Sequence, residues 1–183
     1  MNRSIKIFIA FIIIIWLIQL LSYIIPLQQY GLVPRTSYGL MGIFTSPFLH
    51  ANWNHLIGNT TSLIGLSIIL FYLERDKMIS KMVLMVIIGG SLTWLFARTA
   101  NHIGASGLIF AIWGYILLSA WFSRKPKYIW LSILVIFLYG GMIYGIIPLQ
   151  VGVSWEGHLF GLIAGIYLAW YFHKKGQHKR ENA

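Results

Sequence analysis

The stretch from Gly104 to Trp121, GASGLIFAIWGYILLSAW, begins with four small residues and continues with few polar side chains. A run of this length and apolarity predicts a helix that spans a membrane. Ser106 lies between small residues at the start of this helix, where free backbone N–H groups can stabilise an anion, so the serine can be interpreted as a nucleophile. The alternative is a small-residue face for helix packing, which is common in membrane proteins.

The composition places the whole chain in a membrane. Of its 183 residues, 58% are hydrophobic and 10% are charged, against about 25% charged residues in an average globular protein. The length leaves no room for a separate soluble domain, so we expect an all-α polytopic bundle that forms one domain over residues 1–183. The six predicted spans are about 5–25, 54–73, 79–96, 104–122, 129–147 and 155–172.

The basic residues are distributed unevenly between the loops. Twelve of the fourteen lie on the side of the predicted termini, and only Arg35 and Arg98 lie on the other side. Because positive residues favour the cytoplasm, this predicts a multi-pass plasma-membrane protein with both termini cytoplasmic. The net charge of +10 is then explained by topology, and no nucleic-acid partner is expected. The long, apolar first loop, 26–53, is expected to be partly helical and to lie at the membrane interface.

Two polar residues lie at the outer end of the second predicted span. His55 and Asn59 are one helical turn apart, so their side chains can point to the same place. Neutral histidine and asparagine side chains can donate hydrogen bonds to an oxyanion. A polar cluster that caps the helix at the membrane interface is the alternative.

Small residues form matching strips on the fourth and the last predicted spans. These are Gly107, Ala111 and Gly114, and Gly157, Gly161 and Gly165. Small residues let two helices approach closely. If the two strips meet, His158 and Ser106 come within hydrogen-bond reach, and His158 can take the serine proton as a general base. A purely structural hydrogen bond is the alternative for a single histidine.

The acidic residues do not supply a third member of a catalytic triad. Glu156 is on the same side of the membrane as His158, but two residues along a helix turn it about 200° away. We therefore expect a Ser-His dyad, with Phe110 stacked on the imidazole. The motif H-E-x-x-H is absent and Asp76 is the single aspartate, which argues against metalloprotease and aspartyl mechanisms. The histidines have no familiar zinc-ligand spacing, so no metal and no cofactor are expected.

These motifs resemble the rhomboid family of intramembrane serine proteases. The resemblance rests on Thr45-Ser46-Pro47-Phe48-Leu49-His50 continuing to Asn59, on Gly104-Ala105-Ser106-Gly107, and on Gly157-His158 with Gly161 and Gly165. It implies that Ser106 is the nucleophile and that His158 is the general base and later the acid. It also implies that Asn59, His55 and the Ser106 N–H form the oxyanion site, and that His50 braces the first loop by hydrogen bonding.

The family cleaves peptide bonds in or beside transmembrane segments of other membrane proteins, so the resemblance implies such substrates, a lipid bilayer and an active site that opens toward the outer side. Span five and the loop 148–154 would then be the lateral gate and the cap. Three places differ from the common pattern: Met41-Gly42 stands where Trp-Arg is frequent, Phe110 stands where tyrosine is frequent, and Gly157 stands where alanine is common.

Two other classes of function compete with the protease. The first is a catalytically inactive rhomboid-like protein that binds membrane proteins; the presence of Ser106, His158 and Asn59 argues against it. The second is a small transporter, for which glycine-interrupted spans are common, although polar groups would then be expected at several depths. No oligomeric state is predicted.

Overall fold

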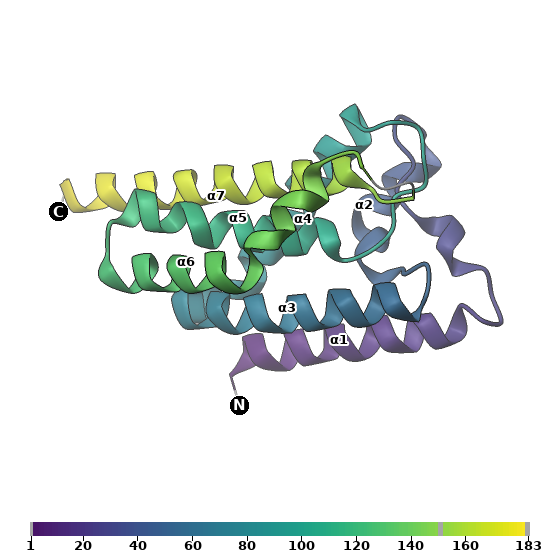
Figure 1. Ribbon diagram of the computed structural model, residues 1–183, viewed down its shortest axis with the longest axis horizontal. Helices are drawn as coiled ribbons and strands as arrows, with labels where there is room; N and C mark the ends of the chain where they lie inside the picture. The colour runs from purple at the N-terminus through teal and green to yellow at the C-terminus, as the bar shows by residue number, and fades with distance from the viewer. Residues whose placement is uncertain (1, 150–151, 182–183) are drawn as a thin grey trace.

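The computed structural model describes residues 2–149 and 152–181, with side chains up to residue 174. In these ranges the long elements are all helices: α1 (Arg3–Leu21), α3 (Trp53–Glu74), α4 (Met78–Phe96), α5 (Ser106–Ser123), α6 (Pro126–Tyr139) and α7 (Trp155–Glu181). Figure 1 shows them side by side in a bundle, with the start of α1 and the C-terminal part of α7 at the same end. The expected all-α class is confirmed.

Four helical stretches of the described chain are long and apolar enough to cross a membrane. One of them, Trp53–Phe96, contains both α3 and α4, which are separated by the short 3-10 helix η4 (Arg75–Lys77). The chain is therefore a multi-pass membrane protein, and the count of six spans stays a prediction.

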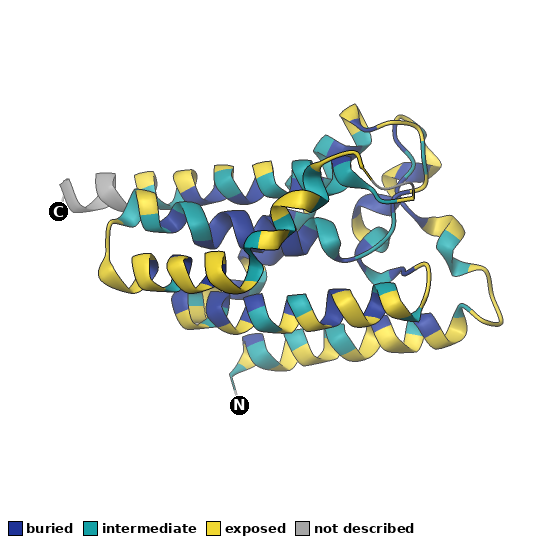
Figure 2. Cartoon of the chain, viewed as in Figure 1, coloured by how far each residue is buried: buried dark blue, intermediate teal, exposed yellow. Residues whose placement is uncertain are grey.

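Helix α5 forms the centre of the bundle. More than half of its residues are buried, whereas only 17% of the apolar window of α1 and 11% of that of Pro126–Ile146, which joins α6 to the following 3-10 helix, are buried. Figure 2 shows this contrast between the dark α5 and the exposed outer helices. Since lipid tails are as apolar as leucine, the exposed aliphatic side chains of α1 and α6 are suited to the bilayer.

The small-residue strips of α5 and α7 lie against each other. A methyl group on Gly161 would overlap the carbonyl of Gly107, and one on Gly165 would overlap the carbonyl of Ala111. Helix α4 joins at the same level, because a Cβ on Gly89 would lie 3.3 Å from the Cα of Gly161. Three helix backbones thus meet at Gly161, and a larger side chain there would force them apart.

The first loop contains four short helices. They are η1 (Leu27–Tyr30), η2 (Tyr38–Leu40), α2 (Gly42–Thr45) and η3 (Ser46–Phe48). A methyl group on Gly42 would overlap the backbone of Leu32. Glycine at this position therefore lets two parts of the loop pack closely. Gly42, one of the two residues that stand where Trp-Arg is frequent, thus has a structural role.

Arg35 attaches the first loop to the end of α4. Its guanidinium donates hydrogen bonds to the carbonyls of Leu95 at 3.2 Å and Ala97 at 2.7 Å. Trp94 adds a bond from its indole N–H to the carbonyl of Thr36 at 3.0 Å. The single β-bridge of the described chain, Leu32 with His102, ties the loop to the segment before α5. The loop is thus held by the protein's own backbone.

The fifth helix is shorter than the predicted span 129–147. Helix α6 ends at Tyr139, and Gly140–Ile146 continue as the 3-10 helix η5. Two consecutive glycines lower the helix propensity at this point, and the tighter 3-10 turn is common at helix ends. Residues 150 and 151 of the predicted cap lie outside the described residues.

Candidate active site

Ser106 and His158 are in hydrogen-bond contact. The distance between Ser106 Oγ and His158 Nε2 is 2.8 Å. Ser106 is the first residue of α5, and the preceding turn depends on Gly104, whose φ of +119° is a conformation that favours glycine. The two side chains therefore come together because the glycine strips bring the starts of α5 and α7 to one place.

The start of α7 is fixed by a serine cap. The Ser154 hydroxyl accepts a hydrogen bond from the Gly157 N–H at 3.2 Å, and the Ser154 carbonyl accepts one from the His158 N–H at 3.2 Å. Such a cap satisfies N–H groups that have no partner inside the helix. It also holds His158 in the first turn of α7, facing Ser106.

A backbone carbonyl orients the imidazole of His158. The Gly145 carbonyl oxygen lies 2.8 Å from His158 Nδ1. Because a carbonyl only accepts, Nδ1 carries the proton, and the lone pair of Nε2 faces the Ser106 hydroxyl. The ring also stacks on Phe110, with centroids 4.3 Å apart and 7° between the planes. The expected stacking is present, whereas the Gly145 contact was missed by sequence reasoning.

Glu156 points away from this pair. Its carboxylate is buried and lies 3.4 Å from Nε of Arg98, and Arg98 also donates to the carbonyl of Val153 at 2.7 Å. This ion pair joins the start of α7 to the segment after α4. The carboxylate therefore has a structural partner and no contact with His158, as the helical spacing predicted.

His55 and Asn59 converge on the backbone beside Ser106. A Cβ built on Gly104 would lie 2.7 Å from His55 Nε2 and 3.2 Å from Asn59 Nδ2. The Ala51 N–H points at His55 Nδ1 over a long 3.5 Å, which favours the tautomer with the proton on Nε2. Asn59 Nδ2 is buried without a hydrogen-bond partner among the described residues. Two donors thus face the position next to the serine.

His50 is buried, and its ring packs against that of His55. The two rings meet edge to face with centroids 5.1 Å apart. Within the described residues neither ring nitrogen of His50 has a hydrogen bond of ordinary geometry, so the predicted bracing through the imidazole is not seen. The main chain does brace the loop, because the His50 carbonyl accepts a bond from Gln28 at 3.4 Å. Burial, and secondarily His55, lowers the pKa of His50 to about 4, with the Phe48 carbonyl opposing them.

His102 is a site residue whose role the sequence did not indicate. Its Nδ1 lies 2.5 Å from the Ser154 hydroxyl, and its Nε2 lies 3.1 Å from the carbonyl of Arg98. It therefore supports the cap of α7, and through it His158. Burial lowers the pKa of His102. In the sequence His102 is marked only by its place four residues before Ser106. It lies outside the predicted helix and has no spacing typical of metal ligands.

The catalytic pair and the two candidate oxyanion donors border one cavity of about 570 Å³. Its lining includes Ser106, His158, His55, Asn59 and Gly145. In the described part of the chain no three His, Cys, Asp or Glu side chains come together as metal ligands. The arrangement combines a hydroxyl beside a neutral imidazole with amide and imidazole donors, which is suited to acyl transfer.

Comparison with known proteins identifies the family. Residues 37–175 match the family model of the Rhomboid domain. The chain is 34% identical over 172 residues to the protein Rv1337 of Mycobacterium tuberculosis, covering 88% of this chain and 72% of that protein.

Two plant proteins are also similar. The chain is 32% identical over 137 residues to RHOMBOID-like protein 1 of Arabidopsis thaliana, covering 71% of this chain and 34% of that protein. It is 29% identical over 150 residues to Rhomboid-like protein 11, chloroplastic, of the same plant, covering 71% of this chain and 51% of that protein. The chain therefore belongs to the rhomboid family of membrane proteins.

Proposed function

We propose that this protein is an intramembrane serine endopeptidase that hydrolyses peptide bonds in or next to transmembrane segments of other membrane proteins. The observation that carries the proposal is the 2.8 Å contact between Ser106 Oγ and His158 Nε2, in a cavity that also contains His55 and Asn59. An unactivated hydroxyl is a poor nucleophile, and an adjacent base is what activates it.

In the proposed acylation step, Ser106 Oγ attacks the carbonyl carbon of the scissile bond while His158 Nε2 takes the hydroxyl proton. The carbonyl oxygen becomes an oxyanion, which His55, Asn59 and the Ser106 N–H stabilise by hydrogen bonds. His158 then gives its proton to the leaving amine. A water molecule releases the acyl group in the second step, with His158 again as the base.

The imidazolium that forms in each step has neutral partners. The Gly145 carbonyl accepts from Nδ1, and the face of Phe110 lies 4.3 Å from the ring. A carbonyl oxygen and an aromatic face both attract a cation, so they substitute for the carboxylate of a triad. This supports a dyad mechanism.

The proposal includes the topology predicted by the sequence. The protein would be one domain of six spans in the plasma membrane, with both termini cytoplasmic and the active site opening toward the outer side. The start of α1 and the C-terminal part of α7 lie at the same end of the bundle, which supports an even number of spans. The low burial of Pro126–Ile146, which contains α6, supports its role as a lateral gate through which a transmembrane substrate enters.

The test compares three purified full-length proteins in liposomes that contain a model transmembrane substrate. Wild type should cleave the substrate and react with a fluorophosphonate probe, and Ser106→Ala should do neither. Ser119→Ala is the matched control, since Ser119 is a buried serine near the other end of α5, and it should behave as wild type.

The same assay separates the competing functions. A fluorophosphonate reaction that is lost in His158→Ala would support the protease, because the serine needs its base. Cleavage by the Ser106→Ala protein would overturn the mechanism. A wild-type protein that binds the substrate without cleaving it would favour the inactive binder, and solute flux through the liposomes would favour the transporter.

A further inference from the structure

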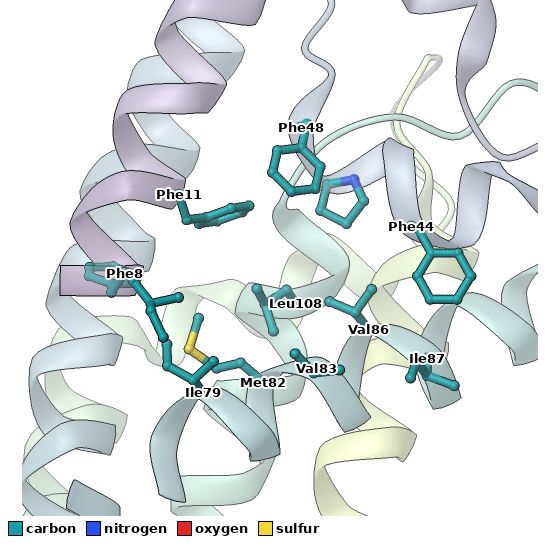
Figure 3. A pocket seen from close by; sticks show the side chains of 12 residues that line it. Phe8, Phe11, Phe44, Phe48, Ile79, Met82, Val83, Val86, Ile87 and Leu108 are labelled. Atoms are coloured by element: carbon teal, nitrogen blue, oxygen red, sulfur yellow. The ribbon is translucent and has the colours of Figure 1, made fainter. Parts of the chain in front are cut away.

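An apolar groove lies between α1, the first loop and α4, and it shares no lining residue with the catalytic cavity. It has a volume of about 280 Å³, and every residue of its lining is apolar. Figure 3 shows the side chains that point into it from α1, the first loop and α4. The most prominent are Phe8, Phe11, Phe48, Met82, Val86 and Leu108.

The groove is open at its rim and closed at its floor. Met82 and Leu108 are each 6% exposed and form the floor, whereas Ile7, Val83 and Ile87 at the edge are more than a third exposed. Helices α1 and α4 belong to stretches that can cross a membrane. The open side therefore faces the hydrocarbon of the bilayer, where water is excluded.

A lipid chain is the molecule that fits this shape. The part of α4 from Ile79 to Ile87 is about 12 Å long at the rise of an α-helix, close to the roughly 15 Å of hydrocarbon in one leaflet. An empty groove of this size would lose dispersion contacts along all its walls. Lipid tails lie directly beside it, and an apolar lining offers nothing to a polar ligand.

The charge at one end of the groove indicates which lipid. Arg3 lies one helical turn before Ile7, and Lys77 lies two residues before Ile79, so both are at the end where α1 and α4 begin. Lys6 in α1 and Arg75 in η4 are two more basic residues at this end. The acidic residue of these two helices in the described chain is Asp76, which accepts a hydrogen bond from Asn2. Helix α1 and η4 are in contact. Four basic residues against one acid attract an anionic headgroup.

We propose that this groove binds one acyl chain of an anionic phospholipid, whose phosphate lies against Arg3 and Lys77. The shape of the groove selects an extended chain, and the basic end selects the charge of the headgroup. The site is separate from the catalytic cavity, and the proposal does not depend on protease activity.

The test uses photo-crosslinking in liposomes of phosphatidylcholine and phosphatidylglycerol. The probe is phosphatidylglycerol with a diazirine on one acyl chain, and labelled peptides are identified by mass spectrometry. Wild type should be labelled on residues 7–11 and 79–87. Val86→Trp fills the groove and should lose this labelling, and so should Val83→Trp at the exposed rim, which keeps the test valid if the first variant does not fold.

The matched control is Leu84→Trp, because Leu84 is on the same helix and exposed but is not part of the groove. It should be labelled as wild type. Neutralising Arg3 or Lys77 to glutamine should reduce labelling by phosphatidylglycerol about five-fold each, with no change for a phosphatidylcholine probe.

Three results would overturn the proposal. The first is equal labelling of Val86→Trp, Val83→Trp and Leu84→Trp. The second is equal labelling of wild type by the two headgroups, which would leave only unselective contact with the bilayer. The third is a crosslink from groove residues to a second copy of the chain or to the transmembrane substrate, which would assign the groove to a protein.

Discussion

At the residue scale, Asn59 has the environment that most needs an explanation. Its amide nitrogen is buried without a partner in the described residues, and such a donor costs about 1–3 kcal/mol. An oxyanion beside Ser106 would supply the missing acceptor. Asn59→Ala should therefore lower kcat about 10²-fold with little change in KM, because the bond forms only in the transition state. Cleavage kinetics in detergent would measure both constants.

The control for Asn59 is Thr61→Ala on the same helix. Thr61 is exposed, and its hydroxyl donates to the carbonyl of Ile57 at 2.9 Å. This variant should keep wild-type turnover. Wild-type turnover in Asn59→Ala as well would assign Asn59 to structure alone.

His50 should make the stability of the fold depend on pH. Its pKa is about 4 in the folded protein against 6.5 in an unfolded chain, so the unfolded state binds more protons between these values. Its contribution is complete above about pH 6.5 and is lost as the pH falls toward about 4, by about 3 kcal/mol in total. Thermal unfolding in detergent should show a smaller loss between pH 7 and pH 4.5 in His50→Gln. An equal loss in both proteins would exclude His50 as the source.

At the scale of the elements, the contact of α5 with α7 decides whether the dyad forms. A methyl on Gly161 would overlap the Gly107 carbonyl, whereas a methyl on Gly58 in α3 would meet nothing within 4 Å. Gly161→Ala should therefore lower both the unfolding temperature and the rate of cleavage. Gly58→Ala should not lower the unfolding temperature, since its methyl group meets no other atom and only backbone freedom is removed. Wild-type activity in Gly161→Ala would show that the helices can separate without moving His158.

The sequence predicted the parts of the site that depend on helical spacing. Gly107 and Gly161 lie on regular strips, so their contact, and with it the meeting of Ser106 and His158, follows from the geometry of two helices. The same spacing predicted that Glu156 turns away. The α-helical class and most helix positions were predictable for the same reason, because apolar runs of this length have one stable form in a bilayer.

The parts that were not predicted depend on the paths of loops. The carbonyl of Gly145 has no side-chain signature, and it reaches His158 only because η5 replaces the end of the predicted span. Likewise, Arg35 binds the carbonyl of Leu95 at the end of α4, which is 60 residues away along the chain. His102 and Ser154 are 52 residues apart. A single sequence gives no measure of such long-range contacts.

At the scale of the whole molecule, a buried polar cluster packs against the middle of α5, away from the dyad at the start of that helix. Lys81 of α4 forms an ion pair with Glu74 of α3, with side chains 6% and 9% exposed. The Tyr115 hydroxyl of α5 donates to Glu74 at 2.6 Å, and Lys81 also lies over the ring of Phe172 in α7. The cluster therefore connects four helices, and Tyr115 is about 13 Å along α5 from Ser106.

This cluster should stabilise the bundle without taking part in catalysis. Lys81→Met leaves the Glu74 carboxylate buried and unpaired, which should cost about 3–5 kcal/mol and lower the unfolding temperature in detergent. The double variant Glu74→Gln with Lys81→Met removes both charges and should recover most of that loss. Cleavage measured below the unfolding transition should be normal in both proteins, because neither residue reaches the catalytic cavity. A lower kcat in the folded Lys81→Met protein would instead show that the cluster is coupled to the dyad.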